Sequence, residues 1–260
     1  MDVMDTILQS SRLEHFRRYL GKQLGIHLKL KRFTASASEP LRVTMNILQM
    51  GVNCVIEVGA NTLQFGQSLY DFGYQDRVIS FEPLENAYEI LEKRSSKYQN
   101  WIVAGRCAIG NRDGLVRINV SDNSVFSSVL KITPHYVSHN PKARKVGIEE
   151  VPIYSLDSIT SSFLSGKETL LLKIDTEGYE KQVLEGASDL LQNTLGLKIE
   201  IPLYPIHKNP QYNFYEIIEF VRNLSFMPYS FNVEGVDRHT GRVNTIDGLF
   251  FRTGRGKNWI

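Results

Sequence analysis

The sequence predicts an α/β fold in which helices cover both faces of a doubly wound, mostly parallel sheet. Two observations lead to this prediction. From residue 50 onward, short β-rich runs alternate with helical patterns, which is the order of a parallel sheet with covering helices. Residues 169–174 and 195–201 are continuous apolar runs, which is typical of strands that are covered on both faces.

The individual elements follow from the same patterns, in chain order. We expect strands at 54–58, 78–81, 169–174, 195–201, 227–233 and 249–252. We expect helices at 63–72, 84–95, 183–191 and 215–224, the second of them opened by Pro83.

The middle of the chain is less regular. Residues 102–108 and 115–120 lie on either side of the turn-forming segment 110–114, which predicts a hairpin at the edge of the sheet. Residues 121–148 show no clear periodicity, and a connection of that length predicts a substrate-facing lid, with a plain surface loop as the alternative.

Composition bounds the class of protein. The 260 residues include 42% hydrophobic and 22% charged side chains, which is typical of a globular protein. The net charge is only +2, so no global field favours nucleic acid as a partner. The two cysteines, Cys54 and Cys107, have neither Cys-x-x-Cys spacing nor clustered histidines, which argues against a disulfide framework or a zinc site.

The N-terminal region has a character of its own. Residues 6–24 carry apolar side chains at helical spacing, residues 26–33 alternate as a strand or extended arm, and both are basic. We expect a helical or extended extension at 1–40, docked on a main domain at 41–260, with contact to a partner or an anionic membrane surface as the alternative. Neither a secretory signal nor a transmembrane segment is recognisable, so we expect a cytoplasmic protein.

Two features predict a nucleotide-like cofactor at the carboxyl edge of the sheet. The first predicted strand ends in a turn at residues 57–62, where Gly59 permits a close approach and the next helix offers free N–H groups. Glu82, at the end of the next strand, is placed to accept the hydroxyl protons of a ribose. Because the next glycine is Gly66, the turn lacks the glycine spacing for a pyrophosphate. The sequence therefore favours S-adenosylmethionine over a dinucleotide.

A third feature is acidic. The apolar run at 169–174 delivers Asp175 to the same edge, and Glu177 and Glu180 follow. Carboxylates gathered at one strand end are costly unless they bind cations, polar ligand groups or each other, while capping of the next helix is the structural alternative.

Together these residues resemble the FkbM family of S-adenosylmethionine-dependent methyltransferases, over about residues 50–252. The resemblance is carried by the turn at 58–62, Phe81-Glu82-Pro83, Ala108-Ile109-Gly110, Ser127-Ser128, Leu156-Asp157, the run Lys173-Ile174-Asp175-x-Glu177-Gly178-x-Glu180, and Asp247-Gly248-Leu249-Phe250. It implies a class I methyltransferase (Rossmann-like) fold with a seven-stranded sheet. It also implies methylation of a hydroxyl on a sugar or natural product.

Carried over by position, the resemblance implies that S-adenosylmethionine contacts Glu57, Gly59, Ala60, Asn61, Glu82, Ala108 and Asp175. For removal of the hydroxyl proton we expect Asp175, with Glu177 and His207 as further catalytic candidates and Glu200 and His135 as alternatives. We expect no metal, although Asp175, Glu177 and Glu200 could hold a divalent ion.

One position departs from the family pattern. Leu63 stands where the family usually has glycine, and a side chain there would crowd the cofactor or shift the turn. A degenerate, non-catalytic binding module is therefore the alternative function, and an NAD-dependent oxidoreductase is a more remote one.

Overall fold

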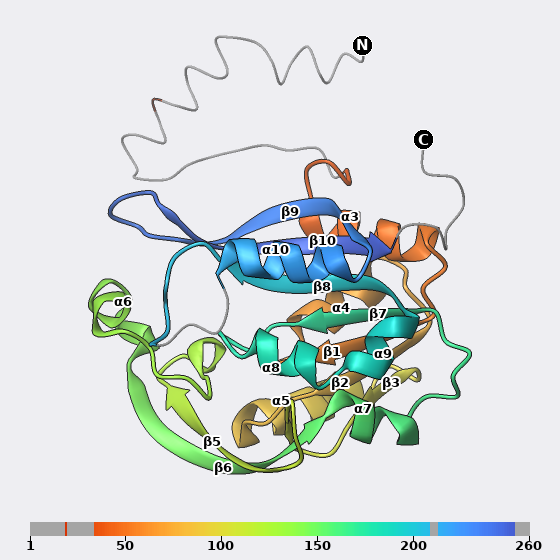
Figure 1. Ribbon diagram of the computed structural model, residues 1–260, viewed down its shortest axis with the longest axis horizontal. Coiled ribbons are helices and arrows are strands. Elements are labelled where there is room, and N and C mark those ends of the chain that lie inside the picture. The colour runs from red at the N-terminus through yellow and green to blue at the C-terminus, as the bar shows by residue number, and fades with distance from the viewer. Residues whose placement is uncertain (1–18, 20–33, 209–212, 253–260) are drawn as a thin grey trace.

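The computed structural model describes Tyr19, residues 34–208 and residues 213–252 (Figure 1). At its centre is a seven-stranded sheet with the order β3-β2-β1-β7-β8-β10-β9. Its strands are β1 (Cys54–Val58), β2 (Arg77–Phe81), β3 (Trp101–Val103), β7 (Leu170–Ile174), β8 (Thr194–Pro202), β9 (Phe226–Val236) and β10 (Val243–Arg252). Only β10 runs antiparallel to its neighbours. This sheet confirms the predicted fold class.

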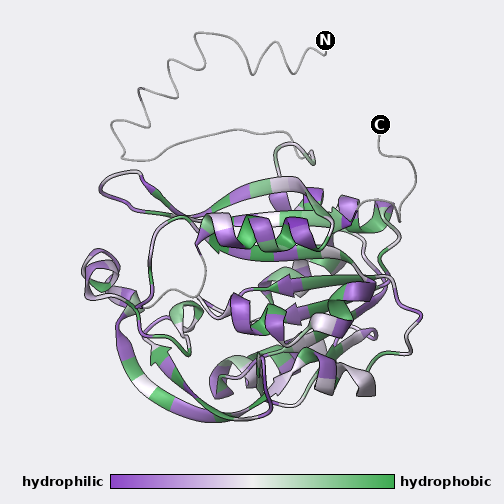
Figure 2. Cartoon of the chain, viewed as in Figure 1, coloured by the Kyte–Doolittle hydropathy of each residue, from purple (hydrophilic) through white to green (hydrophobic). Residues whose placement is uncertain are grey.

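Helices cover both faces of the sheet, as predicted. They are α3 (Glu39–Gln49), α4 (Gln64–Asp71), α5 (Glu85–Ser95), α7 (Leu156–Ile159), α8 (Glu180–Glu185), α9 (Ser188–Asn193) and α10 (Phe214–Asn223). A further helix, α6 (Pro134–His139), lies apart from this sheet (Figure 1). Alternate strand residues point to opposite faces, so Ile56 and Leu172 pack with α7–α10, whereas Val55 and Leu171 pack with α3–α5. Apolar residues accordingly dominate the central strands in Figure 2, while the helices carry both colours.

A second, three-stranded sheet corrects the predicted hairpin. It has the order β4-β6-β5, formed by β4 (Ala108–Gly110), β6 (Lys145–Ser155) and β5 (Gly114–Ser121). The hairpin prediction was wrong because β3 ends at Val103 and joins the main sheet, and because β6 inserts between β4 and β5. This insertion buries Ile118, Val151 and Ile153 against α5, which a simple hairpin would leave uncovered.

The helix predicted at 183–191 is two helices, α8 and α9, separated at Gly186. A Cβ atom at Gly186 would lie 2.0 Å from the main-chain oxygen of Gly110, so the chain needs glycine at this contact. The carboxylate of Asp157 then accepts hydrogen bonds from the N–H groups of Asp189 (3.0 Å) and Leu190 (2.9 Å), which starts α9 anew.

Residues 121–148 are more ordered than their lack of periodicity indicates. They include two short 3-10 helices, η1 (Ser124–Phe126) and η2 (Pro141–Ala143), as well as α6 and the start of β6. The structure therefore has no long structureless loop in this part of the chain.

The N-terminal predictions fall almost entirely outside the described residues. Of the predicted helix at 6–24 and the arm at 26–33, only Tyr19 is described, and it is helical. The sequence did not predict α3, whose Val43 and Ile47 are buried in the same core as Val55. Within the described ranges, no helix combines the length and the apolar character that crossing a membrane requires.

Candidate active site

A cavity of about 530 Å³ lies at the carboxyl ends of β1, β2, β7 and β8. It brings together most of the site residues that the sequence predicts: Glu57, Gly59, Ala60, Asn61, Glu82, Ala108, Asp175 and Glu177. Parallel strands deliver these residues to one edge, which is where ligands bind in doubly wound sheets. Of the predicted site residues, His207 and the alternative base His135 are absent from its walls.

The turn after β1 forms one wall of the cavity. The N–H groups of Gly59 and Ala60 donate to the carbonyl of Phe81 at 3.1 and 3.2 Å, which ties the turn to β2. Asn61 has a φ of 47° and donates its N–H to Glu82 Oε2 at 2.7 Å. The main chain of this turn is therefore fixed before any ligand binds.

Glu57 is a fully buried carboxylate at the floor of the cavity. Ser80 donates its hydroxyl proton to Glu57 Oε2 at 2.8 Å, and Lys173 Nζ lies 3.8 Å from Oε1. Burial raises the pKa of Glu57, and the neighbouring ammonium group of Lys173 opposes that rise. Glu57 Oε1 has no hydrogen-bond partner among the described residues, so it is left available to a donor on a ligand.

Glu82 lies at the end of β2 and is almost fully buried. Its two oxygens accept hydrogen bonds from the N–H groups of Asn61 and Leu84, the latter at 2.9 Å. Burial raises the pKa of Glu82 to about 7, while these two hydrogen bonds lower it. Each carboxylate oxygen has a second lone pair, so Glu82 can still accept the protons of a ribose diol.

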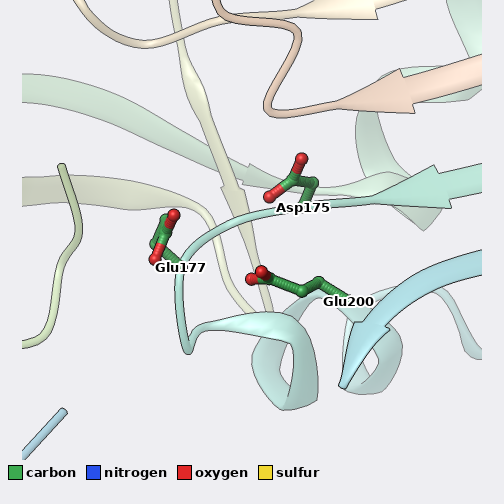
Figure 3. Close-up of side chains that lie close together, drawn as sticks. All are labelled: Asp175, Glu177 and Glu200. Carbon is green, nitrogen blue, oxygen red and sulfur yellow. The ribbon is translucent and has the colours of Figure 1, made fainter. Parts of the chain in front are cut away.

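Three carboxylates face one another at the other end of the cavity (Figure 3). Asp175 and Glu177 follow β7, Glu200 comes from the neighbouring strand β8, and one oxygen from each lies within 4.8 Å of the others. Asp175 also lies 3.2 Å from Lys173 Nζ. Such spacing suits a shared proton as well as a divalent cation.

Glu177 and Glu200 differ from Asp175 in their surroundings. Among the described residues, neither carboxylate has a hydrogen bond or ion pair. Burial, and then repulsion from Asp175 and Glu180, raises the pKa of Glu177 well above its usual range; burial, and then repulsion from Glu177 and Asp175, does the same for Glu200. A buried carboxyl group with a raised pKa is suited to exchanging a proton with a substrate.

Glu180, the last acidic residue of the motif, has a structural role. Its Oε1 accepts hydrogen bonds from the N–H groups of Thr176 and Gly178, both at 3.0 Å, and from the hydroxyl of Thr176 at 3.2 Å. These bonds fix the turn in which Glu177 has a φ of 54°. Glu180 thus stabilises the turn that precedes α8 and does not cap the helix, because these donors lie before its N-cap residue, Tyr179.

Part of the segment predicted as a lid covers the cavity. Residues 124–129 and Tyr136 line it, and Ser128 donates its hydroxyl proton to the carbonyl of Glu177 at 2.6 Å. Asn61 Oδ1 accepts a hydrogen bond from Ser124 at 3.2 Å. The segment thus contacts both the β1 turn and the acidic end, whereas His135 and His139 lie on α6 outside the cavity walls.

His207 lies behind the acidic turn. A Cβ atom at Gly178 would meet His207 Nδ1 at 2.7 Å, so the ring packs directly on the turn. Burial lowers the pKa of His207 to about 4, which leaves the imidazole neutral at pH 7. His207 lines a separate, smaller cavity of about 150 Å³ instead of the main one.

The sequence reasoning did not assign a role to several charged residues at the site. These residues are Glu39, Lys173, Lys198 and Asp247. Lys198 pairs with Asp247 of β10 and lies 3.8 Å from Glu39 of α3, so it joins three elements. A lysine inside an otherwise apolar strand was the available signal at both 173 and 198.

The comparisons with known proteins agree with this geometry. The profile described as the methyltransferase FkbM domain matches residues 57–228. The chain belongs to the FkbM methyltransferase family. Membership supports S-adenosylmethionine-dependent methyl transfer, and the site fits that cofactor, because it offers a buried carboxylate for the ribose and an unpartnered oxygen at Glu57.

Comparison with solved structures lists several α/β proteins of low identity. The Streptococcus pneumoniae protein Sp1610, solved with S-adenosyl-L-methionine, is 12% identical, with a TM-score of 0.45 over 86% of this chain and 75% of that one. A protein of the NADB-Rossmann superfamily from Streptococcus agalactiae is 12% identical, with a TM-score of 0.44 over 90% and 72%. An rRNA methylase from Streptococcus thermophilus is 10% identical, with a TM-score of 0.43 over 86% and 99%. No curated protein matches at a significant level.

Leu63, the departure from the FkbM family pattern, does not crowd the cavity. Its φ is 103°, a value that favours glycine, yet its side chain is 1% exposed and packs with Leu69 and Tyr74 in the core. Leu63 is not among the residues that line the cavity. Leu63 therefore gives no reason to regard the protein as a degenerate, non-catalytic binding module.

Proposed function

We propose that this protein is an O-methyltransferase that methylates a hydroxyl group of a sugar or natural product. A single observation carries the proposal: one cavity joins the residues expected to hold the cofactor to a cluster of three carboxylates. When bound, S-adenosylmethionine supplies an activated methyl group, so the protein has to align the acceptor and take its hydroxyl proton.

The residues divide the cavity into two parts. We assign the ribose to Glu82, the adenine to Ala108, and the methionine group to Glu57 with the turn at 59–61, all of which line the cavity. The acceptor then lies toward Asp175, Glu177 and Glu200. We assign removal of its proton to these carboxylates, because His207 lies outside the cavity.

The charge of the cavity supports a small-molecule or glycan acceptor over nucleic acid. Eight carboxylate side chains line it, against two lysines. Even with some carboxylates protonated, this lining repels phosphate groups. A neutral or cationic hydroxyl compound meets no such barrier.

Calorimetry followed by methyl-transfer assays tests the proposal. We expect the protein to bind S-adenosylmethionine and S-adenosylhomocysteine, and to transfer a tritiated methyl group to members of a panel of sugars and hydroxylated natural products. Mass spectrometry of the product then locates the methyl on oxygen. If neither ligand binds at millimolar concentration, the proposal is wrong; a methylated nitrogen or nucleic acid would refute the O-methylation and the acceptor class.

A further inference from the structure

A row of buried polar side chains crosses the sheet at the floor of the cavity. Ser80, Glu57, Lys173 and Lys198 occupy paired positions on β2, β1, β7 and β8. Each has at most 6% of its surface exposed. Buried charges are retained in a core only where they are paired, so the partners of the two lysines indicate what each one holds in place.

Lys173 contacts the parts of the site that the cofactor's methionine group would meet. Its Nζ donates to the carbonyl of Gly59 at 2.9 Å, lies 3.2 Å from Asp175 and lies 3.8 Å from Glu57. These three residues come from two strands and a turn. One ammonium group therefore fixes the relative positions of all of them.

We propose that Lys173 is a positioning residue for the cofactor, whose ammonium group orients Glu57 and the Gly59 turn toward the methionine group of S-adenosylmethionine. The inference rests on the proposed function. Lys173 acts through its neighbours, because its side chain is buried and its ammonium group is already surrounded by the oxygens of Gly59, Asp175 and Glu57.

The electrostatic balance at Glu57 explains why a lysine is needed there. Burial disfavours the charged carboxylate, and Asp175 repels it from β7, as does Glu82 from the end of β2. Lys173 and, more weakly, Lys198 oppose these effects, and Ser80 donates a hydrogen bond. Without Lys173, the pKa of Glu57 would rise further, which would weaken its pairing with the ammonium group of the ligand.

Lys198 offers a matched control for this role. It lies opposite Lys173 in register, and both Nζ atoms lie over the ring of Phe65, at 5.9 Å for Lys173 and 5.6 Å for Lys198. Its ion-pair partners, however, are Asp247 of β10 and Glu39 of α3, and neither belongs to the β1 turn. Removing its charge tests the effect of losing a buried lysine whose ion pairs do not involve Glu57.

The test compares two ligands that differ in the methionine group. S-adenosylhomocysteine carries the amino-acid portion, whereas 5′-methylthioadenosine keeps the adenosine and lacks it. We expect Lys173→Met to weaken S-adenosylhomocysteine binding by about tenfold or more, and methylthioadenosine binding by less than about threefold, in calorimetry. Lys198→Met should change the two affinities by similar factors, because its ion-pair partners are Asp247 and Glu39 and not Glu57.

A double-mutant cycle tests whether Lys173 acts on ligand binding through Glu57. Glu57→Gln should also weaken the binding of S-adenosylhomocysteine more than that of methylthioadenosine. Combining it with Lys173→Met should lower the affinity little further, because both changes remove the same contact between Glu57 and the ammonium group of the ligand. Lys173→Gln keeps a donor for the Gly59 carbonyl and replaces Lys173→Met if that variant fails to fold. Equal losses for the two ligands, or full affinity for S-adenosylhomocysteine, would overturn the inference. If the parent binds neither ligand, the proposed function fails and this inference with it.

Discussion

Gly59, at the end of β1, packs directly against the main-chain carbonyl of Asp175, which follows β7. A Cβ atom at Gly59 would lie 1.8 Å from that oxygen, and the φ of Gly59 is +75°. On the other side of the same contact, Asp175 donates its N–H to the carbonyl of Val58 at 3.1 Å. This close approach sets the distance between the turn assigned to the cofactor and the acidic cluster.

Gly59→Ala should therefore disrupt both stability and ligand binding. The added methyl overlaps main-chain atoms that cannot move without separating β1 from β7, so we expect the free energy of unfolding to fall by about 3 kcal/mol or more. Binding of S-adenosylhomocysteine should be lost. Urea unfolding and calorimetry measure the two effects.

Gly51→Ala is the control for this variant. Gly51 has a similar φ of +68°, but a Cβ atom there would meet nothing within 4 Å. Gly51→Ala should therefore lower the free energy of unfolding only by the cost of backbone strain, about 1–2 kcal/mol. If Gly59→Ala and Gly51→Ala lost equal amounts of stability and ligand affinity, the contact between Gly59 and Asp175 would contribute to neither.

Leu63→Gly should leave cofactor binding unchanged and lower stability. Glycine relieves the strain of a φ of 103°, about 1–2 kcal/mol, but removes a buried leucine, which costs about 2–5 kcal/mol. We expect a net loss of about 1–3 kcal/mol in urea unfolding. Leu69→Ala removes a leucine from the same core at a helical position, so no backbone strain is relieved. It should lower the free energy of unfolding by the full cost of losing a buried leucine. Tighter cofactor binding by Leu63→Gly would revive the view that this leucine blocks the site.

Leu63 also shows why the sequence could not settle the site alone. The position of this residue in the turn could be predicted, but the direction of its side chain depends on φ, which the sequence does not state. The elements that sequence predicted well, such as β1 and β7, are continuous apolar runs because both of their faces are covered.

The missed elements depend on contacts between distant parts of the chain. β6 carries exposed apolar residues such as Val146 and Ile148 beside buried ones such as Val151, so its alternation is blurred until β4 and β5 pair with it. By contrast, the sequence analysis already grouped Asp175, Glu177 and Glu200 as possible ligands of a divalent ion. The pairing of β8 with β7 brings these three carboxylates together.

Glu82→Gln should weaken every ligand that contains the ribose. We expect methylthioadenosine and S-adenosylhomocysteine to lose about 1–3 kcal/mol of binding free energy each, because hydrogen bonds to a charged acceptor are lost. In the parent, whose Glu82 has a pKa of about 7, affinity for methylthioadenosine should fall as the pH drops from 8 to 6. The variant should show no such slope. Glu89→Gln, on the exposed side of α5, should behave as the parent.

The same carboxyl group makes stability depend on pH in a defined direction. Its pKa is about 7 in the folded protein and 4.5 in the unfolded chain, so folding takes up a proton between these values. The contribution of Glu82 to the free energy of unfolding is thus greatest below pH 4.5 and is lost as the pH rises through 7, by about 3 kcal/mol in total. Urea unfolding of parent and Glu82→Gln across this range would reveal the difference, and parallel curves would contradict it.

His207→Gln should change the pH dependence of stability in the opposite sense without affecting the cofactor site. The pKa of His207 is about 4 when folded and 6.5 when unfolded, so its contribution to stability is present above pH 6.5 and is lost as the pH falls through 4. The stability gap between the parent and His207→Gln should therefore narrow by about 2 kcal/mol between pH 7 and pH 5. His135→Gln, at an exposed position on α6, is the matched control for ligand binding. Binding of S-adenosylhomocysteine should be retained in both variants; its loss in His207→Gln alone would show that the packing of this ring on Gly178 supports the acidic turn during ligand binding.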